Sequence, residues 1–303
     1  RLCGICPVSH HLCAAKAVDG ILGIDQLTLT GEKMRRLMHY GQIFQSHALH
    51  FFYLAAPDLL FGFDAPVEKR NILGVIAERP ELALQGVKMR KFGQEIILAT
   101  AGKKVHGTGA IPGGINKNLS LAERDALLAD LVTMLEWSRK AVALARDYTL
   151  RNFEEISGFG SFDSNHLSLV RADGAMDLYD GKLRAIDAQG EKILDQVDPG
   201  AYLDVLAEEV RPWSYMKFPY LRQLDAAGSE RQCGRQQRTR QRACAQNREA
   251  IHFAPAMAGA LVSTLGSSTP TVRFSRRNTV AAAFLTSSAV MLSYSAGAPK
   301  SLR

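Results

Sequence analysis

Two cysteines separated by two residues, Cys3 and Cys6, constrain this chain more than any other feature of its sequence. A tight turn through Gly4 brings their side chains together, so both sulfur atoms can face one point. Thiolate is a soft ligand that favours zinc, iron and nickel over magnesium or calcium. The pair therefore indicates half of a metal site or a redox dithiol. A run with the character of a helix follows at once and carries His10 and His11.

Composition limits the classes of protein that can hold this pair. The 303 residues can bury a large core in one domain or two, and contents of 47% apolar and 22% charged residues are ordinary for a soluble globular protein. Five cysteines, an odd number spread unevenly, do not resemble a disulfide framework, which favours a reducing, cytoplasmic setting. The chain begins at Arg1 without a signal segment or a scaffold before Cys3, so we expect a fragment.

The net charge of +7 comes from the end of the chain. From Ala226 onward there are eleven Lys and Arg residues against two acids, Glu230 and Glu249. The first 225 residues hold 26 basic and 28 acidic residues, so the body of the chain is nearly neutral.

Apolar spacing and capping signals predict three helices. The first has apolar residues every three or four positions, the second runs from about Glu81 to Gly102, and the third runs towards Arg151. Ser120 and Glu123 form a capping box at the start of the third. The apolar face of the first helix comprises Met34, Leu37, Met38, Gly41, Phe44, Ala48, Phe51 and Phe52, and that of the second comprises Leu84, Val87, Phe92 and Ile96.

Two glycine-containing regions interrupt the helical pattern. Between Ala175 and Val197, the pairs Asp180-Gly181 and Gln189-Gly190 are hairpin turn signals that flank the segments MDLY and KLRAID. The segment HGTGAIPGGINK, residues 106–117, predicts a loop between two helices. Its glycines allow another group to approach the backbone closely, although it lacks the spacing of a phosphate-binding fingerprint.

Three stretches of the body together resemble one protein family. They are RLCGICPVSHHLCAAKAVD, GKKVHGTGAIPGGINKNLSLAERD and RPWSYMKFPYL, and the resemblance covers Arg1 to Leu221. The chain resembles the catalytic large subunit of nickel-iron hydrogenases, and in particular the cytoplasmic bidirectional type that exchanges electrons with NAD. The most specific signal is Arg-x-Cys-Gly-x-Cys with a histidine four residues after the second cysteine. The resemblance implies a truncated α+β fold, mainly α, with a helical core and a small β-hairpin region over residues 1–221.

The resemblance also assigns roles to three residues. The family holds nickel with four cysteine thiolates, two of which bridge to an iron that carries carbon monoxide and cyanide. When these roles are carried over to this sequence, the resemblance implies that Cys3 is a terminal nickel ligand and that Cys6 bridges nickel and iron. His10 lies one helical turn beyond Cys6, where a ring N–H can hydrogen-bond a ligating sulfur. We expect the two sulfur atoms to face each other and His10 to be directed toward them.

The implied reaction is the reversible conversion of dihydrogen to two protons and two electrons, coupled to NAD reduction. Dihydrogen is a very weak acid, so its cleavage needs a soft electrophilic metal and a nearby base, which a ligand thiolate can provide. The implied partners are a small subunit with an iron-sulfur cluster, diaphorase subunits with flavin, and maturation proteins. No other cysteines of this chain are spaced to hold a cluster. Neither nucleic acid nor membrane is expected as a partner.

The later cysteines depart from the family pattern. The family has a second Cys-x-x-Cys near its C-terminus, whereas Cys233 and Cys244 are eleven positions apart among Arg and Gln residues. An acidic motif before Arg1 and a late Pro-Arg-Gly segment are also missing. Because only two of the four thiolates can be assigned, we expect this chain alone to be inactive and not to retain the centre.

Three other interpretations remain open from the sequence. One is the related sulfur- or deazaflavin-linked hydrogenase branch, which differs in its partner subunits. The second is a non-catalytic scaffold like the related subunit of respiratory complex I, against which Cys3 and Cys6 argue. The third is a zinc or dithiol binding module. A zinc site needs two more ligands, and only His10 or His11 is close, while a thioredoxin-like motif follows a strand, which is not predicted here.

The remaining candidate ligands have simpler interpretations. His11 and Cys13 are interpreted as packing residues, with Cys13 acting as a small hydrophobe on an Ala-rich helix. His47, His50 and His106 have no partner at a ligand-like spacing.

Residues 222–303 are interpreted as an aberrant basic tail, rich in Arg, Ser and Ala and translated out of frame. The tail contains RQCGRQQRTRQRACAQNR and has no acid after Glu249, and out-of-frame translation of GC-rich DNA yields such a composition. One alternative is a nucleic-acid-binding arm, since Arg clusters contact phosphates. Another is a membrane anchor at Asn278 to Pro299, which is uncharged but rich in Ser and Thr and therefore too polar.

Shifting the reading frame by one or two bases after the Leu221 codon should restore family-like sequence that ends in a second Cys-x-x-Cys followed by His. Apolar residues that were never selected to pack cannot offset the entropy of ordering the tail. Limited proteolysis should therefore cut first between Arg231 and Arg248. A protected tail, with no family-like sequence in either shifted frame, would favour the basic-arm interpretation instead.

Overall fold

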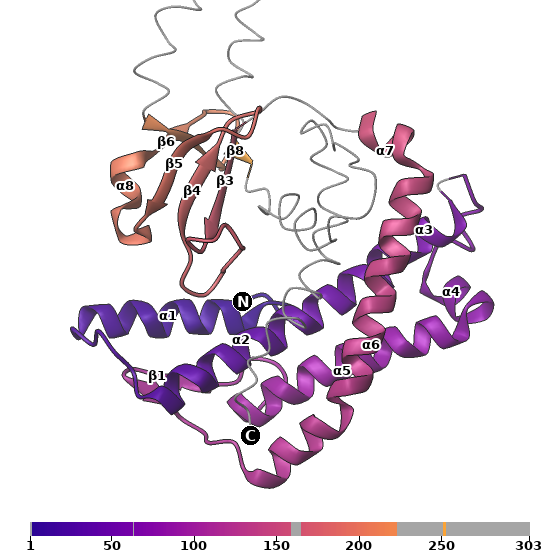
Figure 1. Cartoon of the computed structure of the whole chain (residues 1–303), viewed down its shortest axis with the longest axis horizontal. Helices are drawn as coiled ribbons and strands as arrows, with labels where there is room; N and C mark the ends of the chain where they lie inside the picture. Colours follow the sequence, from indigo (N-terminus) through magenta and orange to yellow (C-terminus); the bar gives the residue numbers. More distant parts are fainter. Residues whose placement is uncertain (1, 63, 159–164, 223–250, 253–303) are drawn as a thin grey trace, which may run out of the picture. The chain divides into compact units, whose positions relative to one another are not determined.

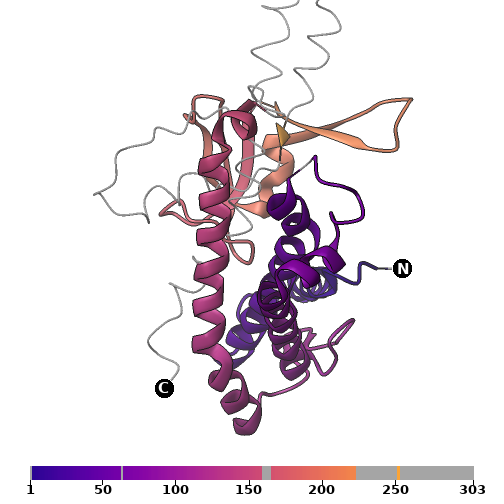
Figure 2. The same cartoon turned by 90° about the vertical axis from the view of Figure 1, so that its right-hand side faces the viewer.

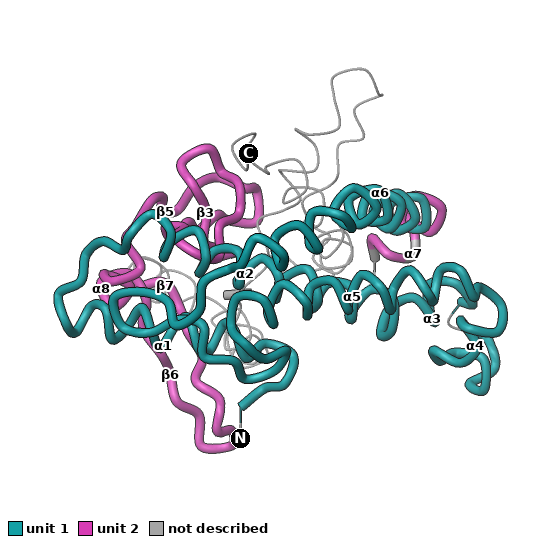
Figure 3. The backbone as a smooth tube through the Cα atoms, turned by 90° about the horizontal axis from the view of Figure 1, so that it is seen from below, with its two compact units in different colours: residues 1–148, 287–303 teal, residues 149–286 magenta. Residues whose placement is uncertain are grey.

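The computed structural model describes residues 2–62, 64–158, 165–222 and 251–252. The chain divides into two compact units, shown in Figure 3: unit 1 comprises residues 1–148 and 287–303, and unit 2 comprises residues 149–286. The predicted boundary between residues 221 and 222 stays a prediction, because most of the tail lies outside the described residues.

Unit 1 is mainly helical, and Figure 1 shows α2 and α5 lying side by side in it. Figure 2 shows the length of α6, whose last three residues belong to unit 2. In chain order the elements are α1 (Pro7–Ile21), α2 (Leu29–Leu49), the π-helix η1 (His50–Ala55), α3 (Ala56–Phe61), α4 (Ile72–Glu78), α5 (Pro80–Ala101), β1 (Ala110–Ile111), β2 (Gly114–Ile115) and α6 (Leu121–Arg151).

The predicted first helix is confirmed as α2, continued by η1. Thr28 caps its N-terminus, since its side-chain oxygen accepts a hydrogen bond from the Gly31 N–H at 3.1 Å. Helices α2 and α5 approach closely at two glycines. A Cβ on Gly41 would lie 2.6 Å from Ile96 Cγ2, and one on Gly93 would lie 2.7 Å from Gln45 Cβ. Any larger residue at either position would therefore push the two helices apart.

The predicted bounds of the second helix match α5, but half of its predicted apolar face is wrong. Phe92 is 7% exposed and Ile96 is 8% exposed, whereas Leu84 and Val87 are 53% and 47% exposed. The buried face instead passes through Ala83, Gly86 and Met89. The reason is that close packing on α2 and η1 selects small residues, so the largest apolar side chains do not mark the contact. A Cβ on Gly86, for example, would lie 2.6 Å from Phe52.

The capping box predicted at the start of the third helix is confirmed at α6. The Glu123 N–H donates to Ser120 Oγ at 3.2 Å, and the Ser120 N–H donates to Glu123 Oε2 at 2.9 Å. Lys117 Nζ also binds Glu123, at 2.7 Å. Hydrogen bonds from Lys117 and Ser120 lower the pKa of Glu123 to about 2. The carboxylate is thus charged at the positive end of the helix dipole at neutral pH.

The core of unit 1 forms where α2, η1, α5 and α6 meet, so all three predicted helices contribute to it. The buried members of this core are Ala48, Phe51, Phe52, Met89, Phe92, Ile96, Met134, Ala141, Val142 and Ala145.

A buried ion pair joins α1 to α2. Arg35 is 0% exposed and Asp19 is 7% exposed, and Arg35 Nη1 donates to Asp19 Oδ2 at 2.6 Å. The hydrogen bond from Arg35, more than any other contact, lowers the pKa of Asp19. A buried charge is tolerated only when it is paired and its remaining donors are satisfied.

The glycine-rich loop, residues 106–117, provides hydrogen-bond partners for the remaining polar atoms of this ion pair. Arg35 donates through Nε to the Gly114 carbonyl at 3.0 Å and through Nη2 to the Ile111 carbonyl at 2.7 Å, and the Gly113 N–H donates to Asp19 Oδ1 at 2.7 Å. The loop contains the small hairpin β1–β2, and Gly113 has a φ of 74°, which favours glycine. The close approach predicted from the glycines is therefore to two side chains of the same chain.

Unit 2 contains most of the β-structure. A four-stranded sheet has the order β5-β4-β3-β8, and β6 and β7 form a separate antiparallel hairpin. The elements are α7 (Phe153–Gly158), β3 (Asn165–Val170), β4 (Lys182–Ile186), β5 (Lys192–Val197), the 3-10 turn η2 (Pro199–Ala201), α8 (Tyr202–Val205), β6 (Leu206–Val210), β7 (Lys217–Leu221) and β8 (Ile251–His252).

The hairpin predicted at Gln189-Gly190 is confirmed between β4 and β5. The segment MDLY is not a strand: it is a turn that makes a single bridge, from Met176 to Val170. The missed strand, β3, pairs antiparallel with β4. Asp180-Gly181 therefore lies at the end of a longer connection between β3 and β4. Within this connection the Gly181 N–H donates to the Asp177 carbonyl at 3.0 Å.

The fold is mainly α with small sheets, as predicted from the sequence. The predicted out-of-frame tail lies outside the described residues, apart from Arg222 and the two residues of β8. No helix in the described parts of the chain combines the length and apolar character needed to cross a bilayer.

Replacing Arg35 with Met should destabilise unit 1 by about 3–5 kcal/mol, because it leaves the Asp19 carboxylate buried without its partner. The pKa of Asp19 is lowered in the fold, so the contribution of this carboxylate is present above its unfolded pKa and is lost as pH falls below it. Denaturant unfolding followed by circular dichroism measures both effects.

The control is Lys140→Met in α6, which removes an ion pair whose side chains are 60% and 59% exposed. Exposed pairs contribute at most about 1 kcal/mol, so this variant should unfold close to the unaltered chain. Equal losses in the two variants would show that burial of the Arg35 pair is unimportant.

Candidate functional site

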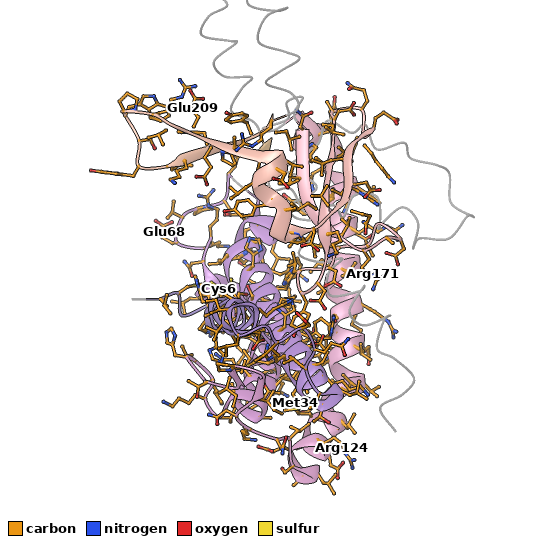
Figure 4. All side chains as sticks on the ribbon, turned by 90° about the vertical axis from the view of Figure 1, so that its left-hand side faces the viewer. Cys6, Met34, Glu68, Arg124, Arg171 and Glu209 are labelled. Atoms are coloured by element: carbon orange, nitrogen blue, oxygen red, sulfur yellow. The ribbon has the colours of Figure 1, made fainter. Side chains whose placement is uncertain are left out.

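Cys3 and Cys6 come together at the N-terminus of α1. Cys6 is the N-cap residue and Pro7 occupies the first helical position, where a missing N–H costs nothing. The backbone N–H groups of Ile5 and Cys6 each donate to Cys3 Sγ at 3.3 Å. The two side chains also interact with each other, which shifts the pKa values of their thiols in opposite directions. Figure 4 labels Cys6 in this segment.

The two thiols differ in acidity. Hydrogen bonds from the Cys6 thiol and then from the two N–H groups lower the pKa of Cys3. The pKa of Cys6 is raised, chiefly because its thiol donates to the Cys3 sulfur. Cys3 is exposed and Cys6 is half-buried. The pair therefore offers one sulfur that becomes a thiolate readily, beside a second that follows at higher pH.

The bend through Gly4 does not itself require a glycine. Gly4 is absent from the residues with positive φ, and a Cβ added to it would meet no atom within 4 Å among the described residues. The turn is held instead by the hydrogen bonds to Cys3 and by a contact from α2.

Two glutamines of α2 hold this segment, and neither was predicted from the sequence. Gln45 Nε2 donates to the Ile5 carbonyl at 2.7 Å, and Gln42 Oε1 accepts from the Ser9 N–H at 2.8 Å. Gln42 Nε2 also donates to Ser9 Oγ. Each glutamine is 4% exposed. Gln45 lies in register with Met38, Gly41 and Ala48 on the predicted apolar face, so a polar residue on that face was the available signal.

The histidines near the pair have different environments. His10 is exposed, and no hydrogen bond within the described segments joins its ring to Cys3 or Cys6, so its supporting role stays a prediction. His11 is half-buried and its Nε2 accepts a hydrogen bond from the Ala110 N–H at 3.0 Å, while burial lowers its pKa. It packs against the β1 strand, as expected. Cys13 is exposed, so its expected packing role is wrong.

The donor set fits half of a thiolate metal centre. Cys3 and Cys6 meet at an accessible turn, and thiolates suit nickel, iron or zinc. Among residues 2–62, 64–158, 165–222 and 251–252, no group of three or more His, Cys, Asp or Glu side chains is placed to hold a metal ion.

Comparison with known proteins points to one family. Residues 1–64 match the model of the nickel-dependent hydrogenase family. The chain is 43% identical over 235 residues to the beta subunit of the NAD-reducing hydrogenase HoxS of Cupriavidus necator, which covers 74% of this chain and 48% of the relative. It is 41% identical over 224 residues to a subunit of the F420-non-reducing hydrogenase vhu of Methanocaldococcus jannaschii, covering 74% and 53%. The chain thus spans about half the length of these curated relatives.

Solved structures show the same likeness. The crystal structure of an NAD+-reducing [NiFe]-hydrogenase in the H2-reduced state is 44% identical, with a TM-score of 0.72, and the match covers 98% of this chain and 66% of that one. The Ni-Fe-Se hydrogenase of D. vulgaris Hildenborough is 18% identical, with a TM-score of 0.57 over 72% of this chain and 51% of its own. The second comparison supports the fold alone.

In the metal-free chain, iodoacetamide near neutral pH should alkylate Cys3 before Cys6, because thiolate is the nucleophile and the pKa of Cys3 is the lower of the two. Cys6→Ala should slow the reaction of Cys3 by removing its principal hydrogen-bond donor. Peptide mapping by mass spectrometry measures each rate, and exposed Cys13 is the internal control, whose rate should not change. Faster labelling of Cys6 would contradict the assigned direction of the hydrogen bond.

Proposed function

Because this chain belongs to the nickel-dependent hydrogenase family, we propose that it is the catalytic large-subunit part of a hydrogenase that couples reversible dihydrogen oxidation to NAD reduction. The observation that carries the proposal is the meeting of Cys3 and Cys6 at the start of α1, where the Cys6 N–H donates to Cys3 Sγ at 3.3 Å, inside the region that matches the family model. The identity of 43–44% to NAD-reducing enzymes supports NAD as the final acceptor.

In this proposal Cys3 and Cys6 hold the metal centre. Cys3 would hold nickel, Cys6 would hold both nickel and an iron that carries carbon monoxide and cyanide, and His10 would support the two cysteines. When bound, such a centre supplies a soft electrophile that polarises dihydrogen. The residues of this chain then have two tasks: they keep both sulfurs at one point, and a thiolate sulfur accepts the proton. The N–H groups of Ile5 and Cys6 stabilise negative charge on Cys3 Sγ, which favours the thiolate form that binds a metal.

The proposed function requires partner subunits. Several relatives are themselves named as hydrogenase subunits. We propose a small subunit with iron-sulfur clusters, diaphorase subunits that pass electrons through flavin to NAD, maturation proteins that load the metals, and a cytoplasmic location. Likeness to the F420-non-reducing enzyme at 41% identity supports a second candidate, a hydrogenase of the same chemistry whose partners deliver electrons to another acceptor.

The complete subunit, produced with its partner and maturation proteins, should reduce NAD+ with dihydrogen and contain nickel and iron. Cys3→Ser and Cys6→Ser should each lose this activity, since each removes a proposed metal ligand. Cys13→Ser is the matched control because Cys13 lies exposed on the same helix, and it should remain active. Spectrophotometry of NADH formation and elemental analysis are the measurements.

Other outcomes identify the alternatives. Dihydrogen oxidation with an artificial dye but not with NAD+ would favour the second candidate. Zinc in place of nickel and iron would favour the zinc module, and a metal-free, inactive complex would favour a non-catalytic scaffold.

A further inference from the structure

We propose that Gln45 is a positioning residue that orients the Ile5–Cys6 peptide so that its N–H is directed at Cys3 Sγ. The inference rests on the proposed metal-binding role of Cys3 and Cys6. It assigns to a residue of α2, 39 positions after Cys6 in the chain, control over the sulfur that the turn presents to a metal.

A single peptide group connects Gln45 to the sulfur. Gln45 Nε2 donates to the Ile5 carbonyl at 2.7 Å, and the Cys6 N–H donates to Cys3 Sγ at 3.3 Å. Both atoms, the Ile5 oxygen and the Cys6 nitrogen, belong to the same peptide unit. That unit is planar, and its C=O and N–H point in opposite directions. Holding the oxygen on α2 therefore sets the direction of the N–H.

Apart from the hydrogen bonds to Cys3 Sγ, the local chain does little to fix this peptide. Gly4 has no positive φ, and a Cβ placed on it would meet no atom within 4 Å in the described part of the chain. Cys3 is exposed, so packing does not immobilise its side chain. Without Gln45 the Ile5–Cys6 peptide is free to rotate and satisfy its carbonyl with water, which turns the N–H away from the sulfur.

Gln45 is itself held rigidly. It is 4% exposed, and α5 lies against it at Gly93, where an added Cβ would be 2.7 Å from Gln45 Cβ. A buried side chain with one packed orientation can position its partner, whereas an exposed one cannot. Outer hydrogen bonds of this kind orient metal ligands and tune their donor strength.

Gln42 provides a matched comparison. It lies on α2 one turn before Gln45, it is equally buried at 4%, and it also holds the α1 segment. Its contacts, however, are with the N–H and Oγ of Ser9, three residues beyond Cys6. Losing Gln42 should therefore cost stability in a similar way without touching the Ile5–Cys6 peptide.

The test uses cadmium, a soft metal that thiolates bind, with the full 303-residue chain. Thiolate-to-cadmium absorption gives the dissociation constant, and the Cys6 amide proton resonance, recorded by NMR, reports the hydrogen bond to sulfur. In Gln45→Met we expect cadmium affinity to fall by about tenfold or more, with an upfield shift of the Cys6 amide proton. In Gln42→Met both readouts should stay at their unaltered values, while thermal stability falls in both variants.

Each outcome decides between hypotheses. If Gln45→Met and Gln42→Met change affinity and the Cys6 resonance equally, Gln45 is merely structural and the inference is wrong, while the proposed function stands. The cadmium absorption of the unaltered chain should disappear in Cys3→Ser. If there is no such absorption, or if it is the same in Cys3→Ser, both the proposed metal site and this inference are contradicted.

A measurement on the unaltered chain covers the case in which Gln45→Met does not fold. The hydrogen-bonded Nε2 proton of Gln45 should shift when cadmium binds, since one rigid peptide links it to the Cys3 sulfur. An unchanged Gln45 resonance on cadmium binding would overturn the inference.

Discussion

The buried guanidinium of Arg35 is the interaction on which the arrangement of unit 1 depends. It joins Asp19 near the end of α1 to the carbonyls of Ile111 and Gly114 in the small hairpin, so one side chain ties together three segments distant in sequence. A charge that is 0% exposed can be accommodated only if all these partners are in place. The position of α1 along α2 and the fold of the glycine-rich loop are therefore linked.

The proposed metal site depends on the same helix pair. Three residues of α2 hold the N-terminal segment: Arg35 binds Asp19, Gln42 binds Ser9, and Gln45 binds the Ile5 carbonyl. These partners follow the reverse order along Ile5 and α1, so α1 and α2 run antiparallel and are held together near both ends of α1. Asp19 lies 13 residues after Cys6, or about 20 Å along a helix at 1.5 Å per residue. The ion pair and the glutamines thus prevent α1, and the cysteines at its start, from sliding along α2.

Polar contacts are suited to fixing the position of α1 along α2, because each donor and acceptor pair forms at only one relative position of the two helices. Apolar side chains contact one another almost as well after a shift of one turn. A shifted Gln42 or Gln45 would instead leave buried donors and acceptors unsatisfied, at about 1–3 kcal/mol for each group. Close glycine contacts between α2 and α5 act in the same direction. A Cβ on Gly41 would meet Ile96 and Gly93, and a Cβ on Gly93 would meet Gln45 and Gly41. The result is a rigid support beneath a turn that is itself exposed.

The sequence by itself indicated a pair of thiolate ligands and predicted several local elements. Two cysteines at this spacing predict convergent sulfurs, the Ser120–Glu123 box predicts the start of α6, and apolar spacing predicts α2, because each signal acts over a few neighbouring residues. Only the tertiary structure decided which face α5 buries, why the loop is rich in glycine, and what holds the Cys3–Cys6 turn. Each of these depends on partners 33 to 94 residues apart in the chain, such as Gln42 with Ser9 and Gly113 with Asp19. A periodic pattern records how apolar a face is, but it does not record which distant backbone group a buried glutamine or arginine will meet.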